Sequence, residues 1–190
     1  MESMHDPQEN GLEKFNSHVN ELLRAIQLCL SNDCVIPSMM LLYAATDGMA
    51  WLFKDHDGNN TGKDFREWVD KFWLVERRSG QVGGISSDDL WSARNALLHE
   101  QTSNSGYTRI GKALPLIYFS GKGRMDIPSG GQWNQKQPVG VRAEDMVAEF
   151  TRAVDRFREF ILQSPSRDRI LSRCAEWFDQ IRPNGYFKCN

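Results

Sequence analysis

The 190-residue sequence contains only four cysteines, and their spacing matches no zinc-binding motif. Cys29 lies among apolar residues, so it is expected to be a buried free thiol. The polar and acidic first ten residues lack the pattern of a signal peptide, and no apolar run is expected to span a bilayer. These absences favour a cytoplasmic protein that needs no metal or other cofactor.

The sequence also has no large excess of one charge, because it contains 23 Lys and Arg residues and 25 Asp and Glu residues. A net charge of -2 excludes a uniformly basic nucleic-acid-binding protein, so any anion-binding surface must be local. No phosphate-binding loop, dinucleotide fingerprint, serine elbow or internal repeat is present. The segment 55–60 has a glycine at the fourth position where a calcium loop needs it at the sixth, so a turn is expected there.

What the sequence does contain is apolar residues at helical spacing over most of its length. This periodicity predicts an all-α fold, an antiparallel bundle of four to six helices in a single domain, 1–190. The predicted helices cover 12–31, 37–54, 64–77, 87–100, 143–163 and 168–181. Six Trp and ten Phe predict a well-filled core.

The segment 101–141 differs from the rest because glycine and proline are frequent in it. It is predicted to be an insertion, irregular or containing a short β-hairpin. Residues 114–119 are expected to form a strand or an extended segment, and Pro115 argues against a central position in a sheet.

An arginine and a histidine lie five residues apart near the end of the fourth predicted helix, in Arg94-Asn95-Ala96-Leu97-Leu98-His99. Arginine can hold a phosphate at any physiological pH, and histidine can carry a proton near neutrality. On an ideal helix Arg94 projects from the middle of an apolar face, with Asn95 and His99 side by side along its edge. A charge in that position needs a partner or a wet cleft.

The second predicted helix offers the partner. Asp47 is the only charged residue from Ser38 to Phe53, and its helical neighbours are apolar or aromatic. We therefore expect Asp47 to pair with Arg94 or to orient His99. A purely structural alternative stays open, in which Asp47 and Arg94 form a buried salt bridge and His99 is favoured by the helix dipole at a C-terminus.

The stretch 90–100 resembles the signature of the HEPN (higher eukaryotes and prokaryotes nucleotide-binding) superfamily, in which Arg, an adjacent polar residue and a later His end a helix of a bundle. The resemblance implies a metal-independent endoribonuclease, often a toxin of a toxin–antitoxin system or an anti-phage defence component, acting as a homodimer whose two motifs face one cleft. It assigns catalysis to Arg94, Asn95 and His99, with Asp47 in support. Other members of the superfamily are non-catalytic modules that bind a partner protein or a nucleotide, and this is the alternative.

The insertion adds a second indication of RNA binding. Between 101 and 142 there are six basic residues and one acidic residue, interleaved with aromatic side chains. Basic and aromatic groups together suit single-stranded RNA, through phosphate contact and base stacking. The candidate RNA-binding residues are Arg109, Lys112, Lys122 and Arg124; the alternative is a solvated loop with a few core anchors.

Overall fold

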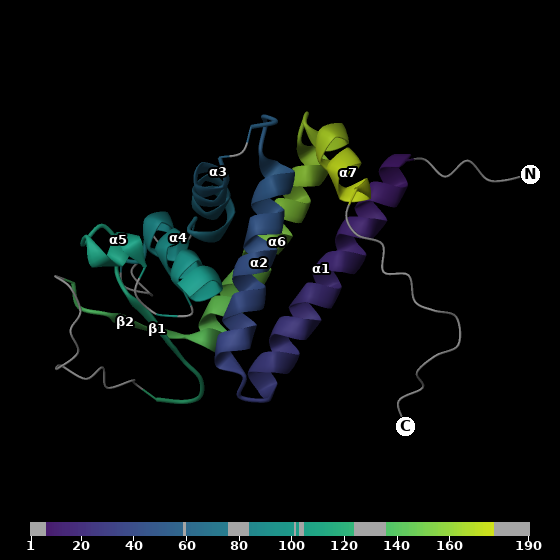
Figure 1. Ribbon diagram of the computed structural model, residues 1–190. Helices are drawn as coiled ribbons and strands as arrows, with labels where there is room; N and C mark the ends of the chain where they lie inside the picture. The colour runs from purple at the N-terminus through teal and green to yellow at the C-terminus, as the bar shows by residue number, and fades with distance from the viewer. Residues whose placement is uncertain are drawn as a thin grey trace, which may run out of the picture.

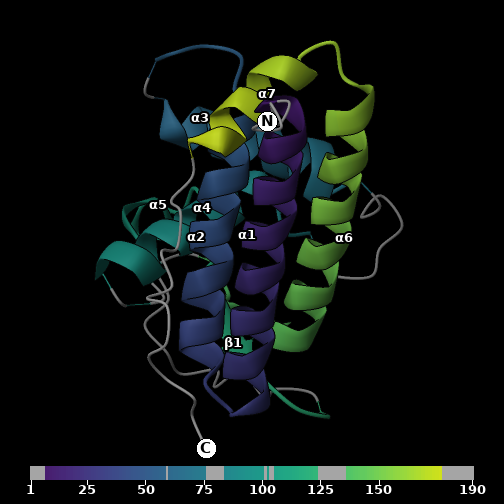
Figure 2. The same cartoon turned by 90° about the vertical axis from the view of Figure 1, so that its right-hand side faces the viewer.

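Three long helices form the body of the protein in the computed structural model, which describes residues 7–58, 60–75, 84–100, 102, 105–123 and 136–176. They are α1 (Pro7–Ser31), α2 (Val35–Phe53) and α6 (Ala143–Gln163), and they lie side by side (Figures 1 and 2). The described chain is mostly helical, as predicted. The helices are not antiparallel throughout, because α2 and α6 run in the same direction and only α1 runs against them.

A short helix, α7 (Arg167–Ala175), closes one end of these three helices by packing across α1. The approach is close at Gly11, where a Cβ atom would collide with the backbone carbonyl of Leu171. A glycine is therefore required at this crossing. The last helix was predicted to continue to Ile181, and residues beyond 176 lie outside the described part of the chain.

A second pair of helices, α3 (Thr61–Trp68) and α4 (Ser87–Asn95), lies against α2 (Figure 1). Each of them continues into a π-helical turn, Val69–Trp73 after α3 and Ala96–Glu100 after α4. The predicted helices 64–77 and 87–100 are therefore present over their described residues, but each widens in its last part. The short helix α5 (Gly106–Arg109) follows α4.

The insertion contains a two-stranded sheet rather than a hairpin, so the hairpin prediction was wrong. Strands β1 (Leu116–Phe119) and β2 (Val139–Arg142) pair in parallel, with Tyr118 opposite Val141. Parallel strands cannot be joined by a tight turn, and the chain must return along the sheet between them. Pro115 lies just before β1, and its carbonyl accepts a hydrogen bond from Val139 N at 2.9 Å.

The core is dominated by aromatic rings from α2, α3, its π-helical turn and α6, as the composition predicted. Phe157 of α6 is fully buried at the centre of this group. Its ring centroid lies 5.0 to 6.3 Å from five other rings, those of Phe15, Phe53, Trp68, Phe72 and Phe160.

Helix α2 meets the length and composition of a membrane-spanning segment, contrary to the expectation from the sequence. In the structure it is packed between α1, α3 and α6. Nine of its residues are buried, which is also the pattern of the core helix of a bundle.

Candidate functional site

Helix α4 is fixed firmly at its N-terminus, which sets the position of the Arg/His motif. Ser86 accepts a hydrogen bond from Asp89 N at 3.2 Å, and Asp89 Oδ2 accepts one from Ser86 N at 2.7 Å, so the two form a capping box. The other carboxylate oxygen of Asp89 accepts a hydrogen bond from Leu114 N at 2.6 Å. One buried carboxylate thus holds both the start of α4 and the chain that enters β1.

The π-helical turn Ala96–Glu100 brings the two ends of the motif together. In a regular α-helix, side chains five residues apart point about 140° away from each other. A π-helical turn has i to i+5 hydrogen bonding and is wider. In this structure Arg94 Nη1 lies 2.7 Å from His99 Nε2. The predicted alignment of Asn95 with His99 along one edge is replaced by an arrangement in which both contact Arg94.

Arg94 is the centre of the site and is paired with Asp47, as predicted. Its Nε lies 2.9 Å from Asp47 Oδ2 and its Nη2 lies 2.6 Å from the same oxygen. Its Nη1 also donates to Asn95 Oδ1 at 2.9 Å. The side chains of Arg94 and Asp47 are 13% and 22% exposed, so the pair lies at the edge of the core, open to solvent on one side.

The contact between Arg94 and His99 has a defined direction. A guanidinium has only donors, so His99 Nε2 accepts the hydrogen bond from Arg94. The His99 residue itself is exposed to solvent.

Trp91, one turn before Arg94, was not identified from the sequence. The Arg94 guanidinium lies 5.2 Å from the centre of its ring, within the range of a cation–π interaction. The absence of a side chain at Gly62 lets the indole lie against α3, since a Cβ atom there would come within 3.0 Å of the ring. Its position three residues before Arg94 was the available signal.

The pKa of Asp47 is raised above its ordinary value, mainly because burial penalises the carboxylate. The hydrogen bond and charge of Arg94 oppose this effect, and the charge that His99 can carry opposes it further. An aspartate whose pKa rises on folding contributes stability that is present below its unfolded pKa and is lost as the pH rises through its folded pKa.

We therefore expect Asp47→Asn to be no less stable than the wild type at neutral pH. The introduced amide keeps an oxygen for Arg94 and removes the cost of a half-buried charge. The free energy of unfolding of the wild type should fall relative to that of the variant as the pH rises above about 4. Urea unfolding of both proteins between pH 3 and pH 7 measures this difference; a variant that is clearly less stable at pH 7 would contradict it.

The insertion contacts α2, the helix that carries Asp47, through two tyrosines. The hydroxyls of Tyr43 and Tyr118 lie 2.5 Å apart, which links α2 to β1 one helical turn before Asp47. Burial and the contact with Tyr43 raise the pKa of Tyr118 well above its ordinary value. The hydroxyl pair was not predicted, because nothing in the sequence shows which residue of the insertion reaches α2.

Of the predicted RNA-binding residues, Arg109 contacts the residue that follows the motif. Its Nη1 lies 2.9 Å from an oxygen of Glu100, the residue after His99. Lys112 and Lys122 are exposed, after α5 and after β1, and Arg124 lies outside the described residues.

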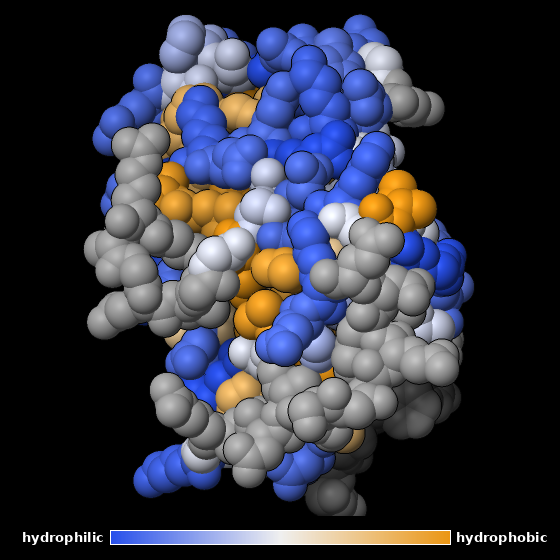
Figure 3. Space-filling view, turned by 90° about the vertical axis from the view of Figure 1, so that its left-hand side faces the viewer, coloured by the Kyte–Doolittle hydropathy of each residue, from blue (hydrophilic) through white to orange (hydrophobic). Residues whose placement is uncertain are grey.

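Figure 3 shows the side of the molecule to the left in Figure 1, where apolar atoms appear between polar ones. The exposed apolar residues of α5 and its end are Tyr107 and Ile110.

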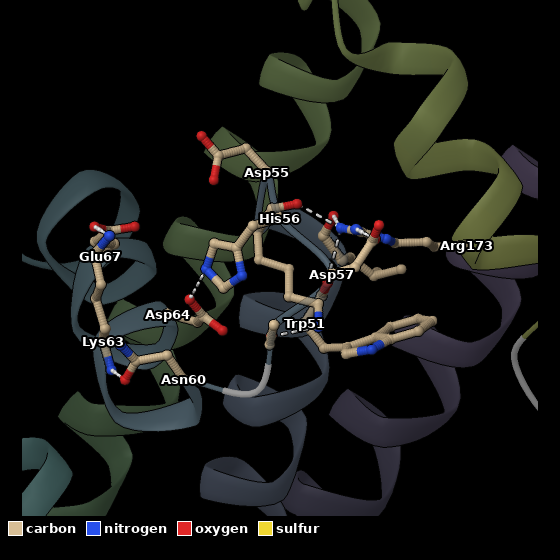
Figure 4. A network of polar contacts seen from close by, with 12 residues as sticks. Trp51, Asp55, His56, Asp57, Asn60, Lys63, Asp64, Glu67 and Arg173 are labelled. Atoms are coloured by element: carbon tan, nitrogen blue, oxygen red, sulfur yellow. Dashed lines mark hydrogen bonds and ion pairs between the residues drawn. The ribbon is translucent and has the colours of Figure 1, made fainter.

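A separate polar cluster lies between α2, α3 and α7 (Figure 4). His56 Nε2 lies 3.0 Å from Asp64 Oδ1, so His56 is tied to α3. Arg173 donates to the carbonyl oxygens of Trp51 at 3.3 Å and of Lys54, at the end of α2. Among the described residues no group of three or more His, Cys, Asp or Glu side chains could hold a metal ion.

The described geometry thus brings together four of the predicted site residues, Asp47, Arg94, Asn95 and His99. Comparison of the chain with protein-family models, with curated proteins and with solved structures found no match.

Proposed function

We propose that this protein is a metal-independent endoribonuclease of the HEPN type, built on a helical bundle. The observation that carries the proposal is the Arg94 guanidinium, which is anchored on Asp47 and holds both Asn95 and His99. A fixed cation, an amide and an exposed imidazole within one hydrogen-bonded group are the equipment that phosphodiester cleavage needs in the absence of a metal.

The chemistry follows from the contact between Arg94 and His99. A phosphate oxygen of the RNA accepts from Arg94 Nη1 in place of the imidazole, which frees the lone pair on His99 Nε2. His99 then removes the proton of the ribose 2′-hydroxyl, which attacks the adjacent phosphorus. The bond to the 5′-oxygen breaks and a cyclic phosphate end remains. Arg94 stabilises the extra negative charge of the transition state, and Asn95 holds a phosphate oxygen or keeps Arg94 in place.

A second histidine is needed to protonate the leaving oxygen, since His99 has just accepted a proton. A homodimer in which two copies of the motif share one cleft supplies it. Apolar Ile110 and Tyr107 are exposed near the Glu100–Arg109 pair, and such residues favour contact with a second copy. A role as a toxin or a defence component, held inactive by an antitoxin, is consistent with this activity.

The proposal is tested by incubating the protein with mixed RNA in the presence of EDTA. We expect cleavage with cyclic phosphate ends, and a loss of about 10³-fold in His99→Ala, because general base catalysis is removed. His18→Ala is the matched control, since His18 lies on α1 away from the motif, and it should cleave as the wild type does. Activity that survives in His99→Ala, or that EDTA abolishes in the wild type, would refute the proposal.

The second candidate is a non-catalytic module that binds a nucleotide or a partner protein. The contacts of Arg94 are the observation in its favour. Of the five N–H groups of a guanidinium, Asp47 engages the one on Nε and one on Nη2, and Asn95 and His99 engage the two on Nη1. One N–H remains for an incoming phosphate unless His99 is displaced. Binding of RNA or a nucleotide without any cleavage would favour this candidate.

A further inference from the structure

The turn between α1 and α2 places two of the cysteines in a defined relationship. Asp33, two residues after the end of α1, has the left-handed backbone conformation, with φ at 58°. Asp33 N donates to Leu30 O at 3.1 Å, and Cys34 N donates to Cys29 O at 2.9 Å. These two hydrogen bonds define a Schellman motif. Cys29 and Cys34 are the residues joined by the outer bond, which spans five positions in the sequence. The side chains at these two positions commonly contact each other across the turn.

The hydrogen bond also limits the distance between the two Cα atoms. With standard backbone dimensions, a 2.9 Å bond from Cys34 N to Cys29 O allows at most about 6.8 Å between them, and the bends at both atoms shorten this. Disulfides form over Cα separations of about 4.4 to 6.8 Å. The backbone of the turn is therefore already within the range of a disulfide.

The two thiols are also the accessible ones among the described cysteines. Cys34 is exposed and Cys29 is half-buried, which corrects the expectation that Cys29 is fully buried. Cys174 of α7 is buried, and burial raises the pKa of its thiol to about 12. A reactive thiol must be accessible and able to ionise, so Cys174 is an inert reference within the same molecule.

We propose that Cys29 and Cys34 are a reversible oxidation site that forms an intramolecular disulfide in response to a peroxide. The Cys34 thiolate attacks one oxygen of hydrogen peroxide and the O–O bond breaks, which gives a sulfenic acid and a hydroxide. The hydroxide takes up the proton that the Cys34 thiol released and becomes the first water. The Cys29 thiolate then attacks the sulfenic sulfur, the S–O bond breaks, and the departing hydroxide takes up the proton from the Cys29 thiol to give the second water. Two thiols are oxidised and one peroxide is reduced to two waters. A dithiol reductant restores both thiols by exchange at the exposed Cys34 sulfur.

The site is independent of the Arg94 motif, because it lies in the connection between α1 and α2 and uses none of the motif residues. A disulfide would close the α1–α2 connection covalently, between two helices that pack extensively against each other. The proposal therefore stands whether or not the protein cleaves RNA.

The test uses the reduced full-length protein and hydrogen peroxide at low molar excess. A protease that cleaves before aspartate cuts between Asn32 and Asp33, so fragments carrying Cys29 and Cys34 stay joined only if a disulfide links them. We expect joined fragments, an intact mass lower by two hydrogen atoms, and full reversal by dithiothreitol. Cys29→Ser and Cys34→Ser should each lose the link, whereas Cys174→Ser and Cys189→Ser should keep it.

A second measurement needs no variant. Phenylarsine oxide binds two neighbouring thiols through one arsenic atom, so one equivalent should protect both Cys29 and Cys34 from alkylation in the wild type. Separate fragments after oxidation, a link from Cys34 to Cys189, or independent alkylation of both thiols in the presence of phenylarsine oxide would each overturn the proposal.

Discussion

Replacement of Arg94 by lysine is expected to lower the rate of the proposed RNA cleavage about 10³-fold, although the positive charge is kept. The guanidinium contacts three side chains at once, with two nitrogens on Asp47 and the third on Asn95 and His99. A lysine ammonium is a single point charge, so it cannot keep the carboxylate and the imidazole in these positions together. Initial rates on a short single-stranded RNA, with circular dichroism to verify the fold, measure the effect.

Arg66→Lys is the matched control for this variant. Arg66 also lies over the ring of Trp91, at 6.0 Å, but it pairs with Asp88 and makes no contact with the motif. It should retain the wild-type rate. If Arg94→Lys kept more than about a tenth of the activity, the prediction would be wrong. The site would then need only a positive charge at this position and not the several planar donors of a guanidinium.

Replacement of Phe157 by alanine is expected to lower the free energy of unfolding by about 4 kcal/mol. Phe157 is fully buried, and its ring lies within 6.3 Å of five other aromatic rings, four of them from segments far apart in the sequence. Truncation removes apolar contact and leaves a cavity that these rigid rings fill poorly. Urea unfolding monitored by tryptophan fluorescence measures the loss.

Phe160→Ala provides the comparison on the same helix. Phe160 stacks on Phe157 with centroids 6.3 Å apart, but it is only half-buried and part of its surface faces solvent. Its loss should cost about half as much as that of Phe157. Equal costs for the two variants would mean that the aromatic cluster is not centred on Phe157.

Much of the helical architecture could be predicted from the periodicity of apolar residues, because burial of one helix face is a local pattern. Helix α6 covers 143–163 as predicted, and α4 begins at Ser87 as predicted, with Ser86 as its cap. The pairing of Asp47 with Arg94 followed from a different argument, since two opposite charges on apolar helix faces each need a partner.

The remaining features depend on contacts that no local pattern encodes. The sequence pattern does not mark where α4 widens into a π-helical turn. The contact of Arg94 with His99 could therefore not be obtained from the projection of an ideal α-helix. The direction of β2 relative to β1 depends on the path of the chain between them, and the Tyr43–Tyr118 contact depends on where that path ends.

The contacts of Arg173 have a consequence for the order in which the molecule is assembled. This side chain satisfies backbone carbonyls at the end of α2 that are 119 to 122 residues earlier in the chain. During synthesis the C-terminal end of α2 is made long before the residue that closes it. Until α7 emerges from the ribosome, those carbonyls depend on water, and the aromatic core beside them lacks its cover. Completion of the fold is thus coupled to translation of nearly the whole described chain.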